Sequence, residues 1–295
     1  MDGPVVVGID DFEHSDRLIA TAAREAQLRG TALWLANAFH GYAPVTQGIP
    51  PGLTSEQILR DAVEEQLAQV AARTKAEFGD LHIETAALAG PAVAALAELA
   101  NLDSLLVVGG RGRGGLSGQL LGSVSLGVLS QASCPVLVVR GDREQVRGRV
   151  MLGVDVNLDV DGSDTGPEVL EFAFNEAARR DASLYAFHAW EDPSLLYAYG
   201  TRAFPNEHRQ AALERRRKLL DTILAPWREM HPKVPVSFEV LAGLPAKLLV
   251  ESTELADLVV IGGKAHKSKD GMRVGAIAHT VLHHARCPVA IVPEH

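Results

Sequence analysis

The sequence predicts an α/β protein made of two repeated, five-stranded, parallel, doubly wound domains. The chain has 295 residues, about twice the ~150 residues that are typical of one domain. Short apolar runs alternate with long amphipathic stretches along the whole length. The same segments also occur twice in the same order, which makes the second half of the chain a copy of the first.

The repeat fixes where we expect the domains to begin and end. Each copy opens on a strand that leads to an aspartate and closes on a Cys-Pro-Val segment. The matched segments are VVVGID (5–10) and VMLGVD (150–155), LLVVG (105–109) and LVVIG (258–262), and the two segments that begin at Cys134 and Cys287. We therefore predict domains at residues 1–140 and 149–295, with a polar linker, GDREQVRG, at 141–148.

Five strands are predicted in the first copy. Each is a short, continuous run rich in Val, Leu and Ile, which is typical of parallel strands that are buried on both faces. In chain order these runs lie at about 4–9, 32–39, 82–88, 104–109 and 135–140. Because the strands are joined by helices, each copy should form an open parallel sheet with right-handed crossovers.

Four helices are predicted between these strands, where apolar residues recur with a spacing near 3.6 among good helix formers. In chain order they lie at 15–29, 54–78, 91–100 and 120–131. Pro91 suits the first turn of the third helix, as Pro245 does in the second copy. Sheets of this kind bind ligands beyond the carboxyl ends of their strands, so the candidate site should follow strands 1 and 4.

Composition excludes several classes of protein. Hydrophobic residues make up 47% and charged residues 22%, values of an ordinary globular chain. The net charge of −9 gives no basis for non-specific binding to nucleic acid or to an anionic membrane. Two cysteines are too few for a disulfide scaffold, and the first ten residues do not resemble a signal peptide. We expect a cytoplasmic protein that binds neither nucleic acid nor membrane.

A glycine-rich loop follows the fourth predicted strand. It runs from Gly109 to Ser125 and leads into the last helix of the first copy. Glycine lets a backbone approach a ligand closely, and the first turn of a helix attracts phosphate. Residues 110–115 also match G-x-G-x-x-G, but that dinucleotide pattern belongs after the first strand, and no P-loop sequence occurs. The simplest alternative is a flexible loop in which Ser123 caps the helix.

The spacing Gly109-x2-Gly112-x9-Gly122-Ser123 resembles the nucleotide signature of the universal stress protein family, and the chain is similar to a tandem member. The resemblance implies an adenine-nucleotide α-hydrolase-like fold, an adenine nucleotide (ATP or ADP, with or without Mg) between strands 1 and 4, and dimerisation through the last strand. It assigns Asp10 to the adenosine moiety, Ala38 to the adenine wall, and Gly109 and Gly112 to the ribose and phosphate path. The phosphates would be held by Gly122, Ser123, Val124 and Ser125.

The second copy keeps the spacing of this signature but loses two of its residues. The aligned residues are Gly262, Ala265, Gly275 and Ala276. Ala265 adds a methyl group where a positive φ would be needed, and Ala276 lacks a hydroxyl donor. Lysines in the same loop offer partial compensation as point charges. We expect the second domain to be mainly structural.

The resemblance implies an adenine-nucleotide-binding, stress-response regulatory protein that forms a homo-oligomer, with its nucleotide in the first domain and its protein partner unknown. A nucleotide-free dimerisation or partner-docking scaffold is the alternative. No catalytic or metal-ligating set is recognisable in the sequence, and slow ATP hydrolysis would depend on Asp10. A minor hypothesis concerns residues 157–168, whose spacing approaches that of a calcium loop but starts with Asn157 in place of aspartate.

Overall fold

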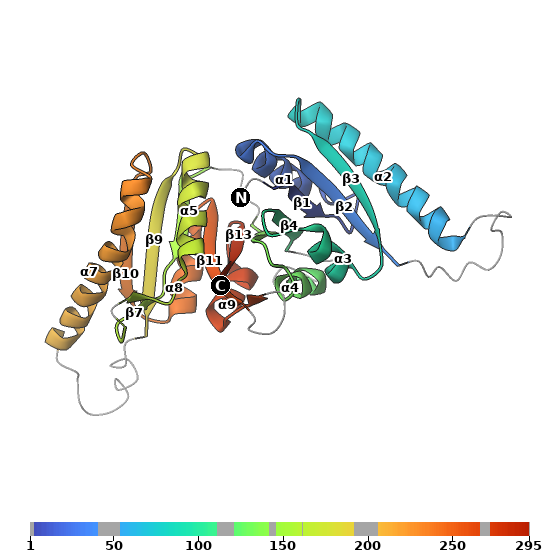
Figure 1. The fold of residues 1–295 in the computed structure, drawn as a ribbon. Coiled ribbons are helices and arrows are strands. Elements are labelled where there is room, and N and C mark those ends of the chain that lie inside the picture. The colour runs from blue at the N-terminus through green and yellow to red at the C-terminus, as the bar shows by residue number, and fades with distance from the viewer. Residues whose placement is uncertain are drawn as a thin grey trace. The chain divides into compact units, whose positions relative to one another are not determined.

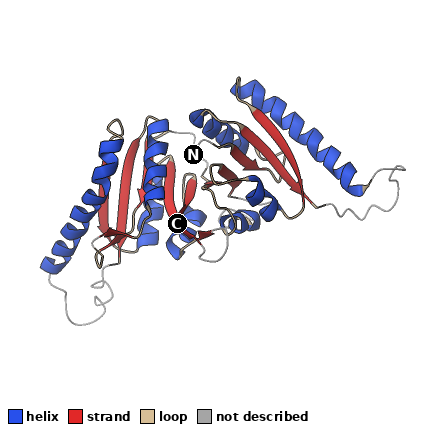
Figure 2. Ribbon diagram, in the orientation of Figure 1, coloured by secondary structure: helices blue, strands red, loops and turns tan. Residues whose placement is uncertain are grey.

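A computed structural model describes most of the chain. The described residues are 3–40, 54–110, 121–141, 146–160, 162–191, 206–265 and 272–294, without the side chains of 206–208 and 265. The chain divides into two compact units, whose main parts are residues 1–139 and 140–264 with 274–295. Figures 1 and 2 show that each unit is a sheet covered by helices.

The first domain holds a five-stranded parallel sheet in the order β5-β4-β1-β2-β3. Its strands are β1 (Val5–Gly8), β2 (Leu33–Phe39), β3 (Ile83–Ala89), β4 (Leu105–Gly109) and β5 (Val136–Val139). Its helices are α1 (Asp16–Arg29), α2 (Ser55–Phe78), α3 (Ala92–Leu99) and α4 (Ser123–Leu129). The α/β fold class is therefore confirmed, and each described element lies within a few residues of its prediction.

The second domain repeats this order as β10-β9-β6-β11-β13, again all parallel. Its parallel strands are β6 (Arg149–Gly153), β9 (Ser183–Trp190), β10 (Val236–Ala242), β11 (Leu258–Ala265) and β13 (Val289–Glu294). Its helices are α5 (Pro167–Arg179), α7 (Asn206–Met230), α8 (Pro245–Ser252), η1 (Thr253–Leu255) and α9 (Ala276–His284). The short strands β7 (Val156–Asn157), β8 (Gly162–Ser163) and β12 (Met272–Arg273) complete the described elements.

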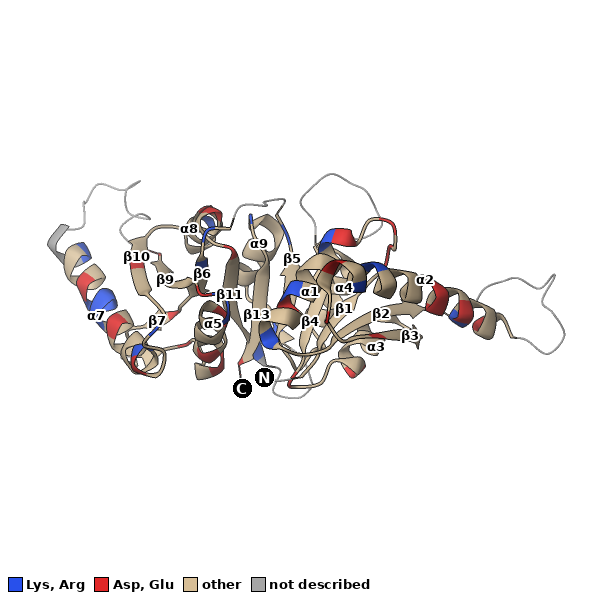
Figure 3. Ribbon diagram, turned by 90° about the horizontal axis from the view of Figure 1, so that it is seen from above, with Lys and Arg blue, Asp and Glu red and all other residues tan. Residues whose placement is uncertain are grey.

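Continuous apolar strands explain why each sheet is the centre of its domain. All four residues of β5 are buried, and Val5, Val6 and Val7 of β1 are fully buried. Helices therefore have to cover both faces. In the second domain α5 and α7 pack on one face and α8 and α9 on the other, as Figure 3 shows. Among the described residues, no helix combines the length and apolarity that crossing a bilayer requires.

The first helix of each copy buries a glutamate with arginine partners. Glu25 of α1 is 7% exposed and lies 4.0 Å from Arg29. Glu176 of α5, at the matching position, is 1% exposed and accepts hydrogen bonds from Arg179 and Arg180. A buried carboxylate is costly unless it is paired, so these arginines offset part of the cost of burying Glu25 and Glu176.

Candidate functional site

The carboxyl edge of the first sheet has its switch point between β1 and β4. Strand β1 pairs with β2 on one side and with β4 on the other. The chain leaves β1 toward β2, whereas β4 leads away to β5, so the connections diverge beyond these two strands. Ligands of open parallel sheets bind at this kind of crevice.

Asp10 stands at this edge directly after a firmly held residue. The Ile9 N–H donates to the Ala36 carbonyl at 2.8 Å, and the Ile9 carbonyl accepts from Asn37 Nδ2 at 2.7 Å. Asn37 is only 8% exposed, whereas Asp10 is exposed. The backbone next to Asp10 is therefore fixed by β2, while its carboxylate is open to solvent. Sequence reasoning missed Asn37, although a polar side chain inside an apolar strand was the available signal.

The carboxylate of Asp11 is directed into the turn that leads to α1. Asp11 Oδ1 accepts from the N–H groups of Glu13 at 2.9 Å and His14 at 3.2 Å. The bond from Glu13 is the largest of the effects that lower the pKa of Asp11, and the bonds from His14 act in the same direction. These donors stabilise the ionised form, so Asp11 stays negatively charged while its carboxylate is tied into the turn.

Ala38 lies farther along β2 than the end of β1. The last pairing between these strands joins Gly8 to Ala36, and Ala38 pairs on its other side with Leu88 of β3. It is partly exposed. A small, partly exposed side chain beyond the end of β1 is suitable for one wall of a flat ring.

The two ends of the glycine-rich segment are joined by a hydrogen bond. Strand β4 ends at Gly109, and the chain re-enters the described region at Leu121, just before the N-cap residue of α4, Gly122. The Ser125 hydroxyl donates to the Gly109 carbonyl at 2.7 Å. Ser125 is 5% exposed, so this bond fixes the first turn of α4 to the end of β4. Gly112 lies outside the described residues.

The beginning of α4 has main-chain N–H groups without a partner in the helix and an exposed serine hydroxyl, as the sequence predicts. No side chain caps the helix at Gly122, and the first N–H groups of a helix have no partner within it. Ser123 is exposed, and Val124 is partly exposed. Together with Asp10 and Gly109, these groups could receive an elongated ligand with an anionic end. The predicted roles of the individual residues remain predictions.

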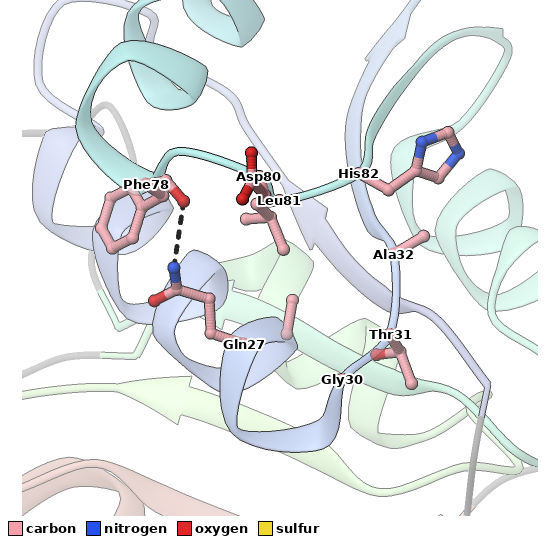
Figure 4. Close-up of a pocket in the computed structure, with 9 residues that line it drawn as sticks. Gln27, Gly30, Thr31, Ala32, Phe78, Asp80, Leu81 and His82 are labelled. Carbon is pink, nitrogen blue, oxygen red and sulfur yellow. Dashed lines mark hydrogen bonds between the residues drawn. The ribbon is translucent and has the colours of Figure 1, made fainter.

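A separate depression lies at the opposite edge of the same sheet. It has a volume of about 610 Å³ and is lined by Ala26, Gln27, Gly30, Thr31, Ala32, Phe78, Asp80, Leu81 and His82 (Figure 4). Gln27 Nε2 donates across it to the Phe78 carbonyl at 3.0 Å. Its residues precede β2 and β3, so it opens at the amino ends of these strands and is distinct from the predicted site.

At the carboxyl edge of the second sheet, the region after β6 resembles the region after β1 in the first domain. The Val154 N–H donates to the Phe187 carbonyl at 2.9 Å, and His188 Nδ1 lies 2.9 Å from the Val154 carbonyl oxygen. His188 therefore holds the residue before Asp155 as Asn37 holds the residue before Asp10. Burial lowers the pKa of His188, which keeps the ring neutral.

The region after β11 differs from the region after β4 in the first domain. Strand β11 continues to Ala265 and pairs with β13 up to Lys264 and Glu294. Ala265 thus belongs to a strand, and Asp181 is the one non-glycine residue with positive φ within the described part of the chain. Ala265 therefore does not adopt the positive φ that the matching position of the signature would need. Helix α9 begins at Ala276 after Gly275, without a side-chain cap.

Comparison with known proteins places the chain in one family. A model of the universal stress protein family matches residues 1–140 and 148–293. A universal stress protein of Mycobacterium tuberculosis H37Rv is 32% identical over 297 residues, covering 98% of this chain and 96% of that protein. One from Mycolicibacterium smegmatis is 33% identical over 294 residues, covering 98% and 96%.

Solved structures agree on the fold. The crystal structure of a universal stress protein from Archaeoglobus fulgidus has a TM-score of 0.67 at 19% identity, over 100% of this chain and 97% of that one. A putative universal stress protein from Pseudomonas aeruginosa has a TM-score of 0.61 at 18% identity, over 99% and 92%. With two family matches along the chain and relatives above 30% identity over nearly its full length, this chain belongs to the universal stress protein family as a tandem two-domain member.

Proposed function

We propose that the first domain binds an adenine nucleotide, ATP or ADP, and that the chain acts as a stress-response regulatory protein. The adenine would lie against Ala38 and the ribose near Asp10. The phosphates would follow Gly109 and Gly112 to the first turn of α4, where Gly122, Ser123, Val124 and Ser125 would hold them. We further propose that the protein acts in the cytoplasm as a homo-oligomer.

The hydrogen bond between Ser125 and Gly109 carries this proposal. It holds the start of α4 beside the end of β4, which is itself paired with β1. Main-chain N–H groups in such a first turn stabilise phosphate without a cationic side chain. The exposed carboxylate of Asp10 at the end of β1 suits hydroxyl groups of a ribose, because a carboxylate is an acceptor of hydrogen bonds.

A bound Mg ion would contribute by neutralising phosphate charge. Asp10, which is exposed at the end of β1, would take part through its carboxylate oxygens. Slow hydrolysis would require the same carboxylate to orient water, and we do not include an enzymatic turnover in the proposal.

Paired glycine substitutions in the two domains test the site. Gly122→Glu puts a side chain and a negative charge where phosphate is expected, so ATP affinity should fall by about tenfold or more in calorimetric titration of nucleotide-stripped protein. Gly275→Glu makes the matched change in the second domain, where a Cβ meets no atom within 4 Å, and should leave ATP affinity unchanged. Unchanged affinity in a folded Gly122→Glu protein would show that the assigned site is wrong.

The alternative scaffold function needs a different measurement. Freshly purified protein is denatured, and the released nucleotide is identified and quantified. A load that approaches one adenine nucleotide for each chain supports the binding function. Absence of nucleotide, together with no heat on titration with ATP or ADP, supports a nucleotide-free scaffold, and a rising ADP fraction with time supports hydrolysis.

A further inference from the structure

Glu294 extends the second sheet beyond the length of the first. When Cys134 is aligned with Cys287, the last pairing of β4 with β5, Gly109 with Val139, corresponds to Gly262 with Val292. The second sheet continues for two more pairs, which end at Lys264 and Glu294. The same alignment places Gly141 opposite Glu294, so the first copy has no side chain at this position.

The Glu294 carboxylate lies between β11 and the beginning of α5. Oε1 accepts a hydrogen bond from the N–H of Gly166, the N-cap residue of α5, at 3.0 Å. A Cβ placed on Gly262 would collide with the same oxygen and would lie 3.2 Å from Val169 Cγ2 of α5. Gly262, which aligns with Gly109 of the first copy, therefore leaves the space that the carboxylate fills.

Charges around this carboxylate act in opposite directions. Lys264 on β11 favours its ionised form, whereas Glu168 on α5 and Asp155 after β6 oppose it. The N–H of Gly166 donates to the carboxylate, and the N-terminal end of α5 favours a negative charge. Burial is the largest effect and raises the pKa of Glu294 above its ordinary value. Glu294 thus sits where a helix start accepts an anion, although two other carboxylates lie nearby.

We propose that the Glu294 side chain occupies the carboxyl edge of the second domain and keeps phosphate-containing ligands out of it. The side chain fills the space over Gly262 and is held there by the N–H of Gly166. The proposal concerns the second domain alone and does not depend on nucleotide binding by the first. The second domain would then be blocked by its own side chain, in addition to the glycine and the serine that its signature has lost.

The test uses a Gly122→Glu background, so that any binding must come from the second domain. With Glu294 intact, titration with ATP or with inorganic pyrophosphate should give no heat. Glu294→Ala should then bind one equivalent of either probe for each chain, with an affinity at least about tenfold above that of the background protein. Glu294→Gly, which installs the residue of the first copy, serves as a second variant if the alanine protein does not fold.

Two controls separate occupancy by this side chain from a general change of charge. Glu294→Gln keeps the length of the side chain and an oxygen for the Gly166 N–H, so it should still exclude both probes. Glu251→Ala removes one exposed negative charge of the same domain, on α8, and should have no effect. Three outcomes would each overturn the proposal: binding by the background protein that an added Gly275→Glu abolishes, binding by Glu294→Gln equal to that of Glu294→Ala, or no binding by either folded small-residue variant.

Success or failure here is independent of the first domain. If the wild-type chain bound no nucleotide in the first domain, the Gly122→Glu substitution would be silent, and the gain caused by Glu294→Ala would still be measured. A wild-type chain that binds ATP through the first domain would leave the same comparison intact.

Discussion

In each domain a side chain of the second strand contacts the backbone carbonyl of the residue that follows the first strand. The side chain is an asparagine in the first domain and a histidine in the second. Asn37 donates through Nδ2 to the Ile9 carbonyl, and His188 bonds through Nδ1 to the Val154 carbonyl. An amide does not titrate in water, whereas an imidazole does. His188 Nδ1 also accepts from the Val156 N–H at 3.3 Å, and Nε2 is a buried nitrogen without a hydrogen-bond partner among the described residues. A second proton would put a positive charge into this buried site, so the stability of the second domain is sensitive to acid.

His188→Asn tests this sensitivity. Burial places the folded pKa of His188 below its ordinary value of 6.5, so the unfolded state binds more protons as the pH falls through that value. Stability is therefore fully present above pH 6.5 and is lost as the pH falls, with a slope of at most about 1.4 kcal/mol for each pH unit. The Val154 carbonyl and Asp155 favour the charged ring, and Arg216 opposes it.

We expect the free energy of unfolding of the wild type to fall more steeply than that of His188→Asn between pH 7 and pH 5 in denaturant titrations. The variant should fold, because asparagine can donate to the Val154 carbonyl as Asn37 donates to the Ile9 carbonyl in the first domain. His284→Asn, an exposed substitution on α9, is the control and should keep the wild-type slope. Equal slopes in the wild type and His188→Asn would contradict the assignment.

At the scale of elements, α4 lies close to α3 because one contact lacks a side chain. A Cβ on Gly127 of α4 would lie 2.5 Å from Val93 Cγ2 of α3. The aligned residues of the second copy are Thr280 and Ala246, so there the larger side chain stands on the other helix. In each domain a small residue on one helix thus faces a larger one on the other, which indicates that the total side-chain volume at this helix contact is constrained. Because α4 carries Gly122 to Ser125, the same contact helps to position the candidate site.

A double-mutant cycle tests the contact. Alanine in place of glycine gains about 0.5–1 kcal/mol of helix propensity, but overpacking costs about 1–3 kcal/mol. Gly127→Ala alone should therefore lower the free energy of unfolding by about 1 kcal/mol. In a Val93→Ala background the same change should raise it, because only the gain in helix propensity remains. If Gly127→Ala has the same effect in both backgrounds, the two helices do not constrain each other through this pair.

The sequence predicted the position of most helices and strands, but it did not predict how far β11 extends. Continuous apolar runs bounded by glycine, proline or polar residues place β1 to β5 within one or two residues, because such strands must be buried on both faces. The extension of β11 to Ala265 was not predicted, since it depends on pairing with β13. The region around Asn157, considered for calcium, is a short hairpin of β7 and β8.

The calcium hypothesis stays a prediction, because Asp161 is not among the described residues; its first position is Asn157. Asn157 Nδ2 donates to Asp164 at 3.0 Å, and its Oδ1 accepts from the Asp159 N–H at 2.9 Å. Both ends of the amide are therefore engaged inside the hairpin. No set of three or more metal-ligating side chains occurs among the described residues, and Asp161 lies outside them. Spacing alone could not reveal this, because bonds within a turn compete with a cation for the same oxygens.

At the site, the sequence identified the edge but not what holds it together. Glycine spacing pointed to Gly109 and Gly122, yet the bond that connects their segments comes from Ser125, whose partner lies sixteen residues away. The contact of Glu294 with Gly166 spans 128 residues and has no local pattern at all. Aligning the two copies gave the available hint, since Gly141 and Glu294 differ completely in size and charge.

At the scale of the whole molecule, duplication gave the chain two carboxyl edges of one topology and different chemistry. The first keeps its glycine signature and an uncapped α4. The second has Ala276 in place of the serine and Glu294 over Gly262. A chain with a net charge of −9 gains nothing in attraction for anions from its overall field, so local donors must decide where a nucleotide binds.

We therefore expect one adenine nucleotide for each chain, held by the first domain. Calorimetric titration of nucleotide-stripped protein with ATP should saturate at a molar ratio near one, because the second edge lacks a hydroxyl donor at Ala276 and is occupied by its own carboxylate. Gly122→Glu should abolish this binding, while Gly275→Glu should keep both its stoichiometry and its affinity. A ratio of two with equal affinities would contradict this difference between the domains. The lysine-bearing loop of the second domain would then have to replace the missing glycine and serine, and Glu294 would have to move away at no cost in free energy.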